Sequence, residues 1–403
     1  MRHVVVVGAS LAGLRAAEAV RRAGHDGDLT IVGAEVHPPY DRPPLSKRVL
    51  TGTAEAGATA LEASDDLGAD WLLGRSVTAV DPFGRRLKIG PAGGSGGGET
   101  LGYDGLVIAT GAHPRRLPGL SDVAGVHYLR TLDDAVALRA ELVGSPRVAV
   151  IGAGFIGAEV ASSCRERGVE VTVIEALPVP LGRALGDEMG RVCAGLHHAG
   201  GATLLTDARV AALVTGRERV EGVRLADGRL VAADVVVVGV GVSPTVGWLA
   251  GSGIDLDDGV RCDARCRVLA GGRPLPEVVA AGDVARWEHP GWDEVVRVEH
   301  WTNAVEQGEA AGTTLVRGEE APLFSPVPYF WSDQYKVKIQ FVGRMAPGDQ
   351  VTVVEGSVAE RRFVAAYGRH GRLVGALGFN RPARVMAYRR MIAAGAPYPA
   401  ENP

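Results

Sequence analysis

The amino-acid sequence predicts an α/β protein with two Rossmann-like dinucleotide-binding domains and a C-terminal α+β domain. A short apolar run, a glycine-rich turn and a helical stretch follow one another twice, first from Val4 and again from Val148. From about residue 324 onward, apolar residues instead alternate with a period of two, which is typical of antiparallel strands. A chain of 403 residues is long enough for two or three such domains.

The first βαβ unit is predicted at the N-terminus. It combines a strand over residues 4–7, a helix over residues 14–23 and a second strand over residues 29–32 that ends near Glu35. The turn between strand and helix reads Gly8-Ala9-Ser10-Leu11-Ala12-Gly13. Ser10 takes the place of the middle glycine, so this turn by itself is weaker evidence for a bound dinucleotide than a turn with three glycines.

The second βαβ unit follows the dinucleotide-binding pattern fully. After a strand over residues 148–151 comes Gly152-Ala153-Gly154-Phe155-Ile156-Gly157, then a helix to Arg167 and a strand that ends at Glu175. In such a turn the first glycine bends the chain, the second lets the backbone approach a pyrophosphate, and the third lets the helix pack on the strand. Glu175 lies where an acid binds the ribose 2′-hydroxyl, which favours NAD over NADP; Arg183 weakens this preference without reversing it.

Shorter elements complete the expected fold. Residues 71–103 are predicted to form short strands, with residues 91–98 as a flexible hairpin loop. Residues 106–111 and 279–283 are each expected to form an apolar strand that ends in a small-residue turn. In the last module the predicted strands begin at residues 336, 351, 362 and 373, and a helix is expected over residues 384–394.

Composition excludes several classes of protein. Hydrophobic residues make up 46% and charged residues 22%, the balance of a folded globular protein. The longest apolar runs are far too short to cross a bilayer, and a net charge of −4 gives no reason to expect nucleic-acid binding. No signal-peptide pattern precedes residue 4, so a cytoplasmic protein is expected. Cys262 and Cys266 lack the spacing and the second pair of a zinc site, so no metal site is predicted.

Several motifs in their order along the chain resemble one family. Residues 8–13, 109–111 and 282–283, with a second glycine turn between them, resemble the FAD-dependent pyridine nucleotide-disulfide oxidoreductases, whose fold is glutathione reductase-like. Residues 39–47 and 330–334 are similar to the ferredoxin and rubredoxin reductase subfamily, the putidaredoxin reductase-like group of oxygenase systems.

The resemblance implies a domain order and a set of site residues. The FAD-binding domain would comprise residues 1–112 and 244–323, the NAD-binding domain residues 113–243 and the C-terminal domain residues 324–403. FAD would be held by Gly8, Ser10, Leu11, Ala12, Gly13, Glu35, Arg42, Lys47, Val77, Ala109, Thr110, Gly111, Arg130, Gly282, Asp283 and Trp301. NADH would be held by Gly152, Gly154, Phe155, Ile156, Gly157, Glu175, Arg183 and Gly241. Lys47 and Glu159 would be catalytic as an ion pair near the flavin N5 and the nicotinamide, with Trp331 at the flavin.

The position of the cysteines narrows the expected chemistry. Relatives that reduce disulfides or peroxides use a thiol against the flavin soon after the first βαβ unit, whereas the first cysteine here is Cys164. The expected reaction is therefore hydride transfer from NADH to FAD, followed by single-electron transfer to a [2Fe-2S] ferredoxin or a rubredoxin. Two alternatives stay open: an NADH oxidase or quinone reductase, and a non-enzymatic flavoprotein that uses NADH as a conformational signal. A monomer or weak homodimer is expected.

Charge is unevenly distributed along the chain. Residues 324–403 contain 11 Lys or Arg and 5 Asp or Glu, whereas the whole chain contains 43 and 47. Because ferredoxins are generally acidic, a basic patch on the C-terminal module is expected to attract one, although a merely solvated basic face is the alternative. The candidate residues are Arg361, Arg362, Arg381, Arg384, Arg389 and Arg390.

Overall fold

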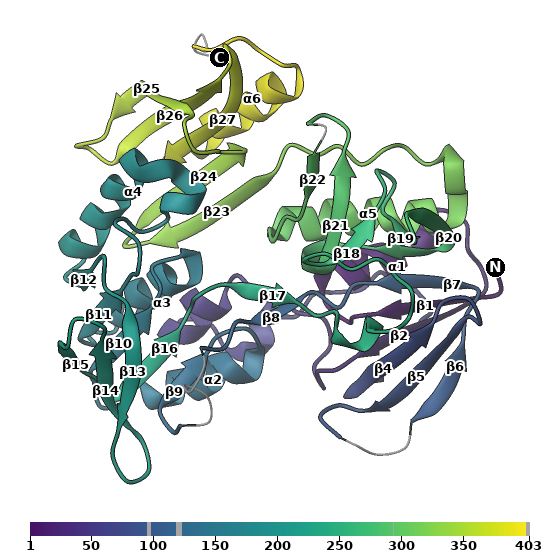
Figure 1. Ribbon diagram of the computed structural model, residues 1–403, viewed down its shortest axis with the longest axis horizontal. Helices are drawn as coiled ribbons and strands as arrows, with labels where there is room; N and C mark the ends of the chain where they lie inside the picture. The colour runs from purple at the N-terminus through teal and green to yellow at the C-terminus, as the bar shows by residue number, and fades with distance from the viewer. Residues whose placement is uncertain (95–97, 118–122, 293, 400–403) are drawn as a thin grey trace. The chain divides into compact units, whose positions relative to one another are not determined.

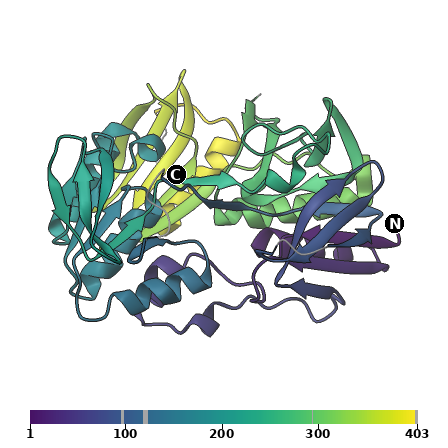
Figure 2. The same cartoon turned by 60° about the horizontal axis from the view of Figure 1, so that its bottom comes forward.

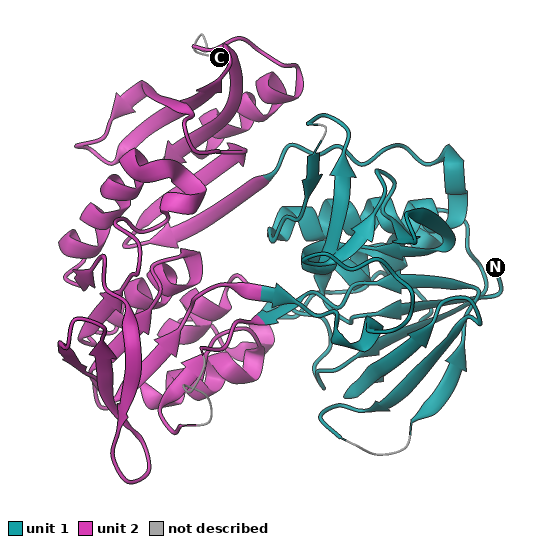
Figure 3. Ribbon diagram, viewed as in Figure 1, with its two compact units in different colours: residues 1–41, 59–113, 243–328 teal, residues 42–58, 114–242, 329–403 magenta. Residues whose placement is uncertain are grey.

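The computed structural model describes residues 1–94, 98–117, 123–292 and 294–399. It divides into two compact units (Figure 3), the first made of residues 1–41, 59–113 and 243–328. The second unit consists of residues 42–58, 114–242 and 329–403. The glycine-rich loop predicted at residues 91–98 falls in part on residues 95–97, which lie outside the described residues.

A nine-stranded sheet forms the core of the first unit, in the order β22-β21-β18-β19-β20-β7-β1-β2-β3 (Figure 1). Its strands are β1 (His3–Val7), β2 (Asp28–Gly33), β3 (Asp70–Leu73), β7 (Gly105–Ile108), β18 (Val260–Cys262), β19 (Arg267–Ala270), β20 (Arg273–Ala280), β21 (Ala285–His289) and β22 (Glu294–Val296). Strand β1 pairs in parallel with β2 and β7, and β7 pairs in parallel with β20. The turns that follow these strands therefore meet at one edge of the sheet.

Helices α1 (Leu11–Arg22) and α5 (Trp301–Arg317) cross closely in this unit. A Cβ on Gly308 would lie 2.6 Å from the carbonyl oxygen of Ala12, and a Cβ on Gly312 would lie 2.3 Å from that of Ala16. Only glycine permits this approach. A separate antiparallel sheet contains β4 (Arg75–Asp81), β5 (Arg86–Pro91) and β6 (Glu99–Gly102).

The second unit contains a parallel sheet in the order β12-β11-β10-β16-β9. Its strands are β9 (Val126–Tyr128), β10 (Val148–Ile151), β11 (Val171–Ile174), β12 (Thr203–Leu205) and β16 (Val235–Val238). Its helices are α2 (Leu132–Glu141), α3 (Phe155–Glu166) and α4 (Gly182–Ala199). A three-stranded sheet adds β13 (Val210–Thr215), β14 (Val220–Leu225) and β15 (Leu230–Ala232). The short strands β8 (Ala112–Pro114) and β17 (Val242–Pro244), most of whose residues belong to the first unit, form a two-stranded sheet.

The C-terminal part of this unit is an antiparallel sheet, which Figure 2 shows from a second side. Its order is β23-β24-β27-β26-β25, and its elements are β23 (Tyr329–Gln334), β24 (Val337–Gly343), β25 (Gln350–Ser357), β26 (Arg362–Arg369), β27 (Arg372–Phe379) and helix α6 (Pro382–Ala393). Phe341 and Phe363 share one buried cluster with Leu185 and Met189 of α4. The C-terminal sheet therefore has a common hydrophobic core with the parallel-sheet part of its unit.

The predicted fold class is confirmed: parallel sheets with glycine turns are followed by an antiparallel C-terminal module. The first helix begins at Leu11, three residues earlier than predicted, because the glycine-rich turn already supplies its first turn. The domain boundaries stay a proposal; residues 42–58, which we had assigned to the FAD-binding domain, group with the second compact unit. No helix among the described residues is long and apolar enough to cross a membrane.

Candidate functional site

The glycine turn of the first unit is shaped by close backbone contacts. Gly8 has a φ of +120°, and a Cβ there would lie 2.1 Å from the carbonyl oxygen of Ala109. A Cβ on Gly13 would lie 1.9 Å from the carbonyl oxygen of Gly8. Ser10 is the N-cap of α1, but its side chain makes no capping hydrogen bond. The N–H groups of the first helical turn, at Leu11 and beyond, are therefore not capped by that side chain, which suits an anion such as a pyrophosphate.

Three further predicted residues belong to other strands of this unit or to the turns that follow them. Glu35 follows β2, and its carboxylate accepts a hydrogen bond from the hydroxyl of Tyr40. Thr110, between Ala109 and Gly111 after β7, donates its hydroxyl to the carbonyl oxygen of Thr245 at 2.9 Å. Val77 on β4 is buried. Glu35 thus follows β2 and residues 109–111 follow β7. These two strands flank β1, which the glycine turn follows.

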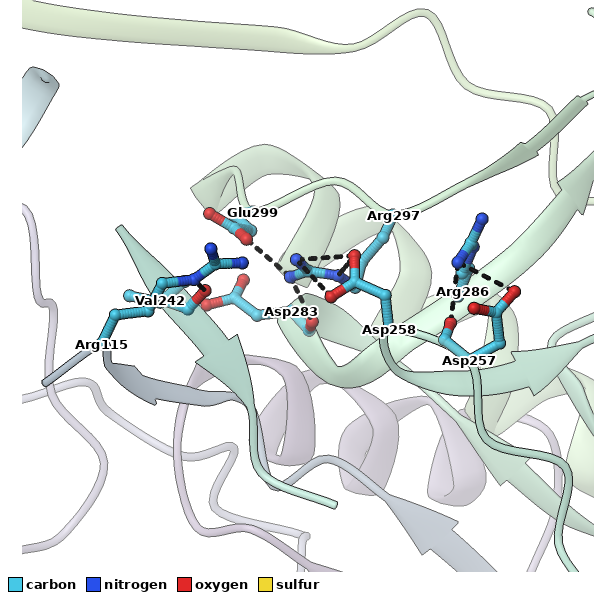
Figure 4. A network of polar contacts seen from close by, with 8 residues as sticks. All are labelled: Arg115, Val242, Asp257, Asp258, Asp283, Arg286, Arg297 and Glu299. Carbon is cyan, nitrogen blue, oxygen red and sulfur yellow. Dashed lines mark hydrogen bonds and ion pairs between the residues drawn. The ribbon is translucent and has the colours of Figure 1, made fainter. Parts of the chain in front are cut away.

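The Gly282–Asp283 turn follows β20 and lies against α1. Gly282 has a φ of +78°, and a Cβ there would lie 2.9 Å from the Cβ of Ala12. Its N–H donates to Oε1 of Gln307 at 2.9 Å, which ties the turn to α5. Arg297 donates to the main-chain carbonyl of Asp283 at 3.2 Å (Figure 4). The turn is therefore held through its backbone.

Helix α5 begins at Trp301, one of the residues expected to hold FAD. The indole Nε1 of Trp301 donates to Oδ1 of Asp41 at 2.8 Å. Burial lowers the pKa of His300, the N-cap residue, to about 4, against a smaller opposing effect of Asp283. His300 is therefore neutral at pH 7, and the positive end of the helix dipole carries no added imidazolium charge.

In the second unit, the glycine turn after β10 meets the three demands of a dinucleotide site. Gly152 has a φ of +98°, and a Cβ there would lie 2.4 Å from the carbonyl oxygen of Gly239. A Cβ on Gly157 would lie 2.0 Å from the carbonyl oxygen of Gly152. Gly154, the N-cap of α3, has an ordinary φ of −73° and no described atom within 4 Å of its Cβ position. The open space at Gly154 fits a pyrophosphate over the helix N-terminus, with Phe155 and Ile156 in the first turn.

Glu175 stands at the end of β11, as predicted for an acid that binds a ribose. Its Oε2 accepts from the N–H of Ala153 at 2.7 Å and its Oε1 from the N–H of Leu177 at 2.9 Å. These bonds fix the carboxylate beside the glycine turn and leave further lone pairs for a hydroxyl group. Arg183 is exposed on the first turn of α4. Gly241 follows β16 with a φ of +98°, and its carbonyl accepts from the N–H of Arg115.

The structure contains the ion pair between Lys47 and Glu159. Nζ of Lys47 lies 2.9 Å from Oε2 of Glu159, and the two side chains are 19% and 3% exposed. Two hydroxyl groups complete the site: Ser46 donates to Oε2 at 2.5 Å and Ser332 donates to Oε1 at 2.7 Å. A buried carboxylate is thus compensated by one cation and two hydrogen bonds, as burial of a charge requires.

The remaining predicted residues of this unit lie on other segments. Arg42 donates to the carbonyl oxygen of Arg130 at 2.6 Å, which joins two of the expected FAD ligands. Trp331 is partly buried on β23, and its ring lies 6.0 Å from that of Tyr329. The roles of these residues toward a cofactor remain expectations.

All four cysteines are free and buried. Burial raises the pKa of Cys164 to about 12, that of Cys193 also to about 12, and those of Cys262 and Cys266 further. At neutral pH each is a thiol, not the thiolate that attacks a disulfide. Within the described ranges, no cluster of His, Cys, Asp and Glu has the arrangement of a metal site.

Sequence reasoning missed several residues of these networks, among them Ser46, Ser332, Tyr40 and Asp41. Each is next to a predicted residue or within the quoted motifs, since Ser46 precedes Lys47 and Ser332 follows Trp331. The motif marked the right segments, but a sequence does not show which hydroxyl reaches which carboxylate.

Comparison with known proteins decides the family. Residues 2–308 match the family model "Pyridine nucleotide-disulphide oxidoreductase". The chain belongs to the pyridine nucleotide-disulphide oxidoreductase family. Residues 329–402 match a second model, "Reductase C-terminal". Membership of this oxidoreductase family implies binding of FAD and of NAD(H).

Relatives within the family include ferredoxin reductases, as the resemblance implied. The ferredoxin–NAD(+) reductase component of the anthranilate 1,2-dioxygenase system of Burkholderia cepacia is 40% identical, over 97% of this chain and 94% of the relative. Rhodocoxin reductase of Rhodococcus erythropolis is 35% identical, over 99% of this chain and 91% of the relative. The reductase in a covalent putidaredoxin reductase–putidaredoxin complex has a TM-score of 0.91 and 30% identity, with 98% and 94% of the two chains covered.

Proposed function

We propose that this chain is an FAD-containing, NADH-dependent ferredoxin reductase that supplies single electrons to a [2Fe-2S] ferredoxin or a rubredoxin of an oxygenase system. The observation that carries the proposal is the pair of glycine turns, one in each unit. In both turns a Cβ on the first or the last glycine would lie within 2.4 Å of a backbone oxygen. Two such turns in one chain suit two dinucleotides, a flavin cofactor and a nicotinamide coenzyme.

The first unit offers the groups that FAD would need. Its glycine turn would offer N–H groups to the pyrophosphate, and Glu35 would accept a ribose hydroxyl. The N-terminus of α5, at Trp301, would stabilise negative charge at the pyrimidine end of the flavin, because the positive end of the helix dipole lies there. FAD, when bound, supplies the chemistry that the chain lacks: it accepts a hydride and gives up single electrons.

The second unit would hold NADH and orient its nicotinamide. The turn from Gly152 to Gly157 would bind the pyrophosphate, and Glu175 would bind the adenosine ribose. Lys47 and Glu159 keep each other in one geometry, since Glu159 is 3% exposed and has three donors. An ammonium group fixed in this way would favour one orientation of the nicotinamide for hydride transfer.

The cysteine chemistry supports electron transfer to an external carrier. Every thiol is buried with a raised pKa, so none of the four is set up to receive electrons from a flavin as a thiolate. Acceptors outside the chain remain, and the relatives at 40% and 35% identity, a ferredoxin–NAD(+) reductase component and a rhodocoxin reductase, favour a one-electron carrier among them.

The test is anaerobic reduction of the holoenzyme by NADH, followed by mixing with a panel of ferredoxins and a rubredoxin. We expect rapid bleaching of the flavin and rapid reoxidation by at least one carrier, with slow turnover on oxygen alone. Fast oxygen or quinone turnover with no response to any carrier would favour an NADH oxidase or quinone reductase instead.

A Glu159→Ala variant tests the hydride step. We expect slower reduction of the flavin by NADH with FAD still bound, because the variant leaves Lys47 without its carboxylate. Unchanged single-turnover reduction would remove Glu159 from the mechanism.

A further inference from the structure

Strand β23 of the C-terminal sheet lies along helix α3 of the same unit. At one end the ring of Phe330 lies 4.6 Å from that of Phe155, which is part of the glycine turn. At the other end the N–H of Tyr335 donates to the hydroxyl of Ser162 at 2.7 Å. Residues 155 and 162 are two turns apart, so they belong to one face of the helix. The C-terminal strand therefore covers the face of α3 that begins at the candidate NADH site.

Glu159 lies in the middle of this face, one turn after Phe155. Its Oε1 accepts a hydrogen bond from the hydroxyl of Ser332 at 2.7 Å. Its other oxygen, Oε2, accepts a hydrogen bond from the hydroxyl of Ser46 and forms the ion pair with Lys47. The two oxygens thus have different partners: Oε1 faces the C-terminal strand and Oε2 faces the Ser46–Lys47 segment.

The hydrogen bonds of this network have one consistent direction. An ionised carboxylate only accepts, so Ser332 must donate its proton to Glu159. Nε2 of Gln334 donates to the oxygen of Ser332 at 3.0 Å, which leaves the hydroxyl proton free to point at the carboxylate. Ser332 and Gln334 are both fully buried, so water does not replace either bond.

We propose that Ser332 is a positioning residue for hydride transfer, through which the C-terminal strand fixes the rotation of the Glu159 carboxylate and hence the place of the Lys47 ammonium group. The inference rests on the proposed role of the Lys47–Glu159 pair. With Oε1 anchored, Oε2 has one orientation in which it meets Ser46 and Lys47 together. Without that anchor the carboxylate turns about its last side-chain bond, and Lys47 loses its fixed partner.

The primary test is Ser332→Ala in the flavin-loaded enzyme. We expect the limiting rate constant for flavin reduction at saturating NADH to fall about tenfold, which corresponds to about 1.4 kcal/mol. The affinity for NAD+, measured by calorimetry, should change less than twofold, because Ser332 does not belong to the glycine turn. Ser332→Thr, which keeps the hydroxyl group, should restore the rate constant to within threefold.

Asp333→Asn is the matched control. Asp333 is the next residue on β23, has a half-exposed side chain, and pairs with Lys338 at 3.1 Å on the other face of the strand. In the Asp333→Asn variant, NADH should reduce the flavin at the wild-type rate. A readout independent of turnover is labelling of Lys47 by an amine reagent, followed by mass spectrometry. Labelling should rise severalfold in Ser332→Ala and stay unchanged in the control.

A double-mutant cycle with Glu159→Gln separates this inference from the proposed function. If Ser332 acts through Glu159, Ser332→Ala should slow a Glu159→Gln enzyme by less than twofold. An equal loss in both backgrounds, or a wild-type rate in Ser332→Ala alone, would overturn the inference and leave the role of Glu159 intact. A wild-type rate in Glu159→Gln itself would overturn both.

Should Ser332→Ala fail to fold, Gln334→Met provides a second variant. It removes the donor to Ser332 while keeping the serine hydroxyl and a side chain of similar length. We expect about a threefold fall in the same rate constant, absent in the Glu159→Gln background. No fall in the otherwise wild-type enzyme would contradict the proposed direction of the hydrogen bonds.

Discussion

Replacing Gly154 with alanine tests whether the turn after β10 holds a pyrophosphate. Gly154 is the N-cap of α3, with a φ of −73° and a ψ of −174°, which alanine adopts without strain. No described atom lies within 4 Å of the position that its Cβ would take. The new methyl group therefore enters the space that we assign to the ligand.

The size of the effect follows from this geometry. Alanine lowers the entropy of the unfolded chain, worth about 0.4–1 kcal/mol, whereas loss of a glycine N-cap costs up to about 1 kcal/mol. The free energy of unfolding should therefore stay within about 1 kcal/mol of the wild-type value. Binding should suffer more, because crowding a close contact costs typically about 1–3 kcal/mol. We expect the Kd for NADH to rise at least about tenfold, or about 1.4 kcal/mol.

Gly157→Ala is the control with the opposite expectation. Its Cβ would lie 2.0 Å from the carbonyl oxygen of Gly152, a backbone atom that cannot move aside without distorting the turn. This variant should unfold at a much lower temperature or fail to accumulate. Thermal unfolding of the two variants and anaerobic calorimetric titration of Gly154→Ala with NADH provide the comparison. A Gly154→Ala protein of normal stability and normal affinity would refute the close approach of a pyrophosphate to this residue.

Three further predictions concern coenzyme choice, the carrier and pH. NADH should exceed NADPH at least about tenfold in kcat/KM, and Glu175→Ala should lose part of that preference; equal use of both by the wild-type enzyme would contradict the ribose assignment. Arg389→Glu with Arg390→Glu should raise KM for a ferredoxin severalfold with NADH–ferricyanide activity intact, and the wild-type ferredoxin rate should fall with salt; a flat salt profile with unchanged KM would place docking elsewhere. Burial lowers the pKa of His197 to about 4, below the value of about 6.5 in an unfolded chain, so unfolding takes up a proton as pH falls from about 6.5 to 4. Stability should be lost through that window by up to about 3 kcal/mol, and denaturant titrations of His197→Gln should show a flatter pH dependence; an identical slope would refute this reading.

Two of the six candidate arginines of the C-terminal module form ion pairs with an acid. Arg384 lies 2.7 Å and Arg381 lies 3.5 Å from the carboxylate of Glu355, so one acid offsets two of the six candidate arginines. Arg390 is exposed near the end of α6. Charge reversal at Arg389 and Arg390 therefore leaves the two ion pairs of Glu355 in place.

The sequence by itself determined the two βαβ units and their glycine turns. Both depend on interactions within about 30 residues: an apolar strand, a glycine that accepts a positive φ, and a helix whose first N–H groups face outward. The positive φ of Gly8 and of Gly152 was therefore readable from residue type and position. The antiparallel C-terminal module was equally readable, because alternation with a period of two is local as well.

Only the tertiary structure decided how Glu159 is held. Its partners are 113 and 173 residues away, in Ser46 and Ser332, and nothing in the local sequence of either serine shows that its hydroxyl reaches a carboxylate. Contacts between segments far apart in the sequence also decided that residues 42–58 group with the second compact unit. Local patterns specify backbone conformation through sterics and helix geometry. The partners of a buried charge are chosen by whichever segments the folded core brings within hydrogen-bonding distance, and that choice is made by packing across the whole unit.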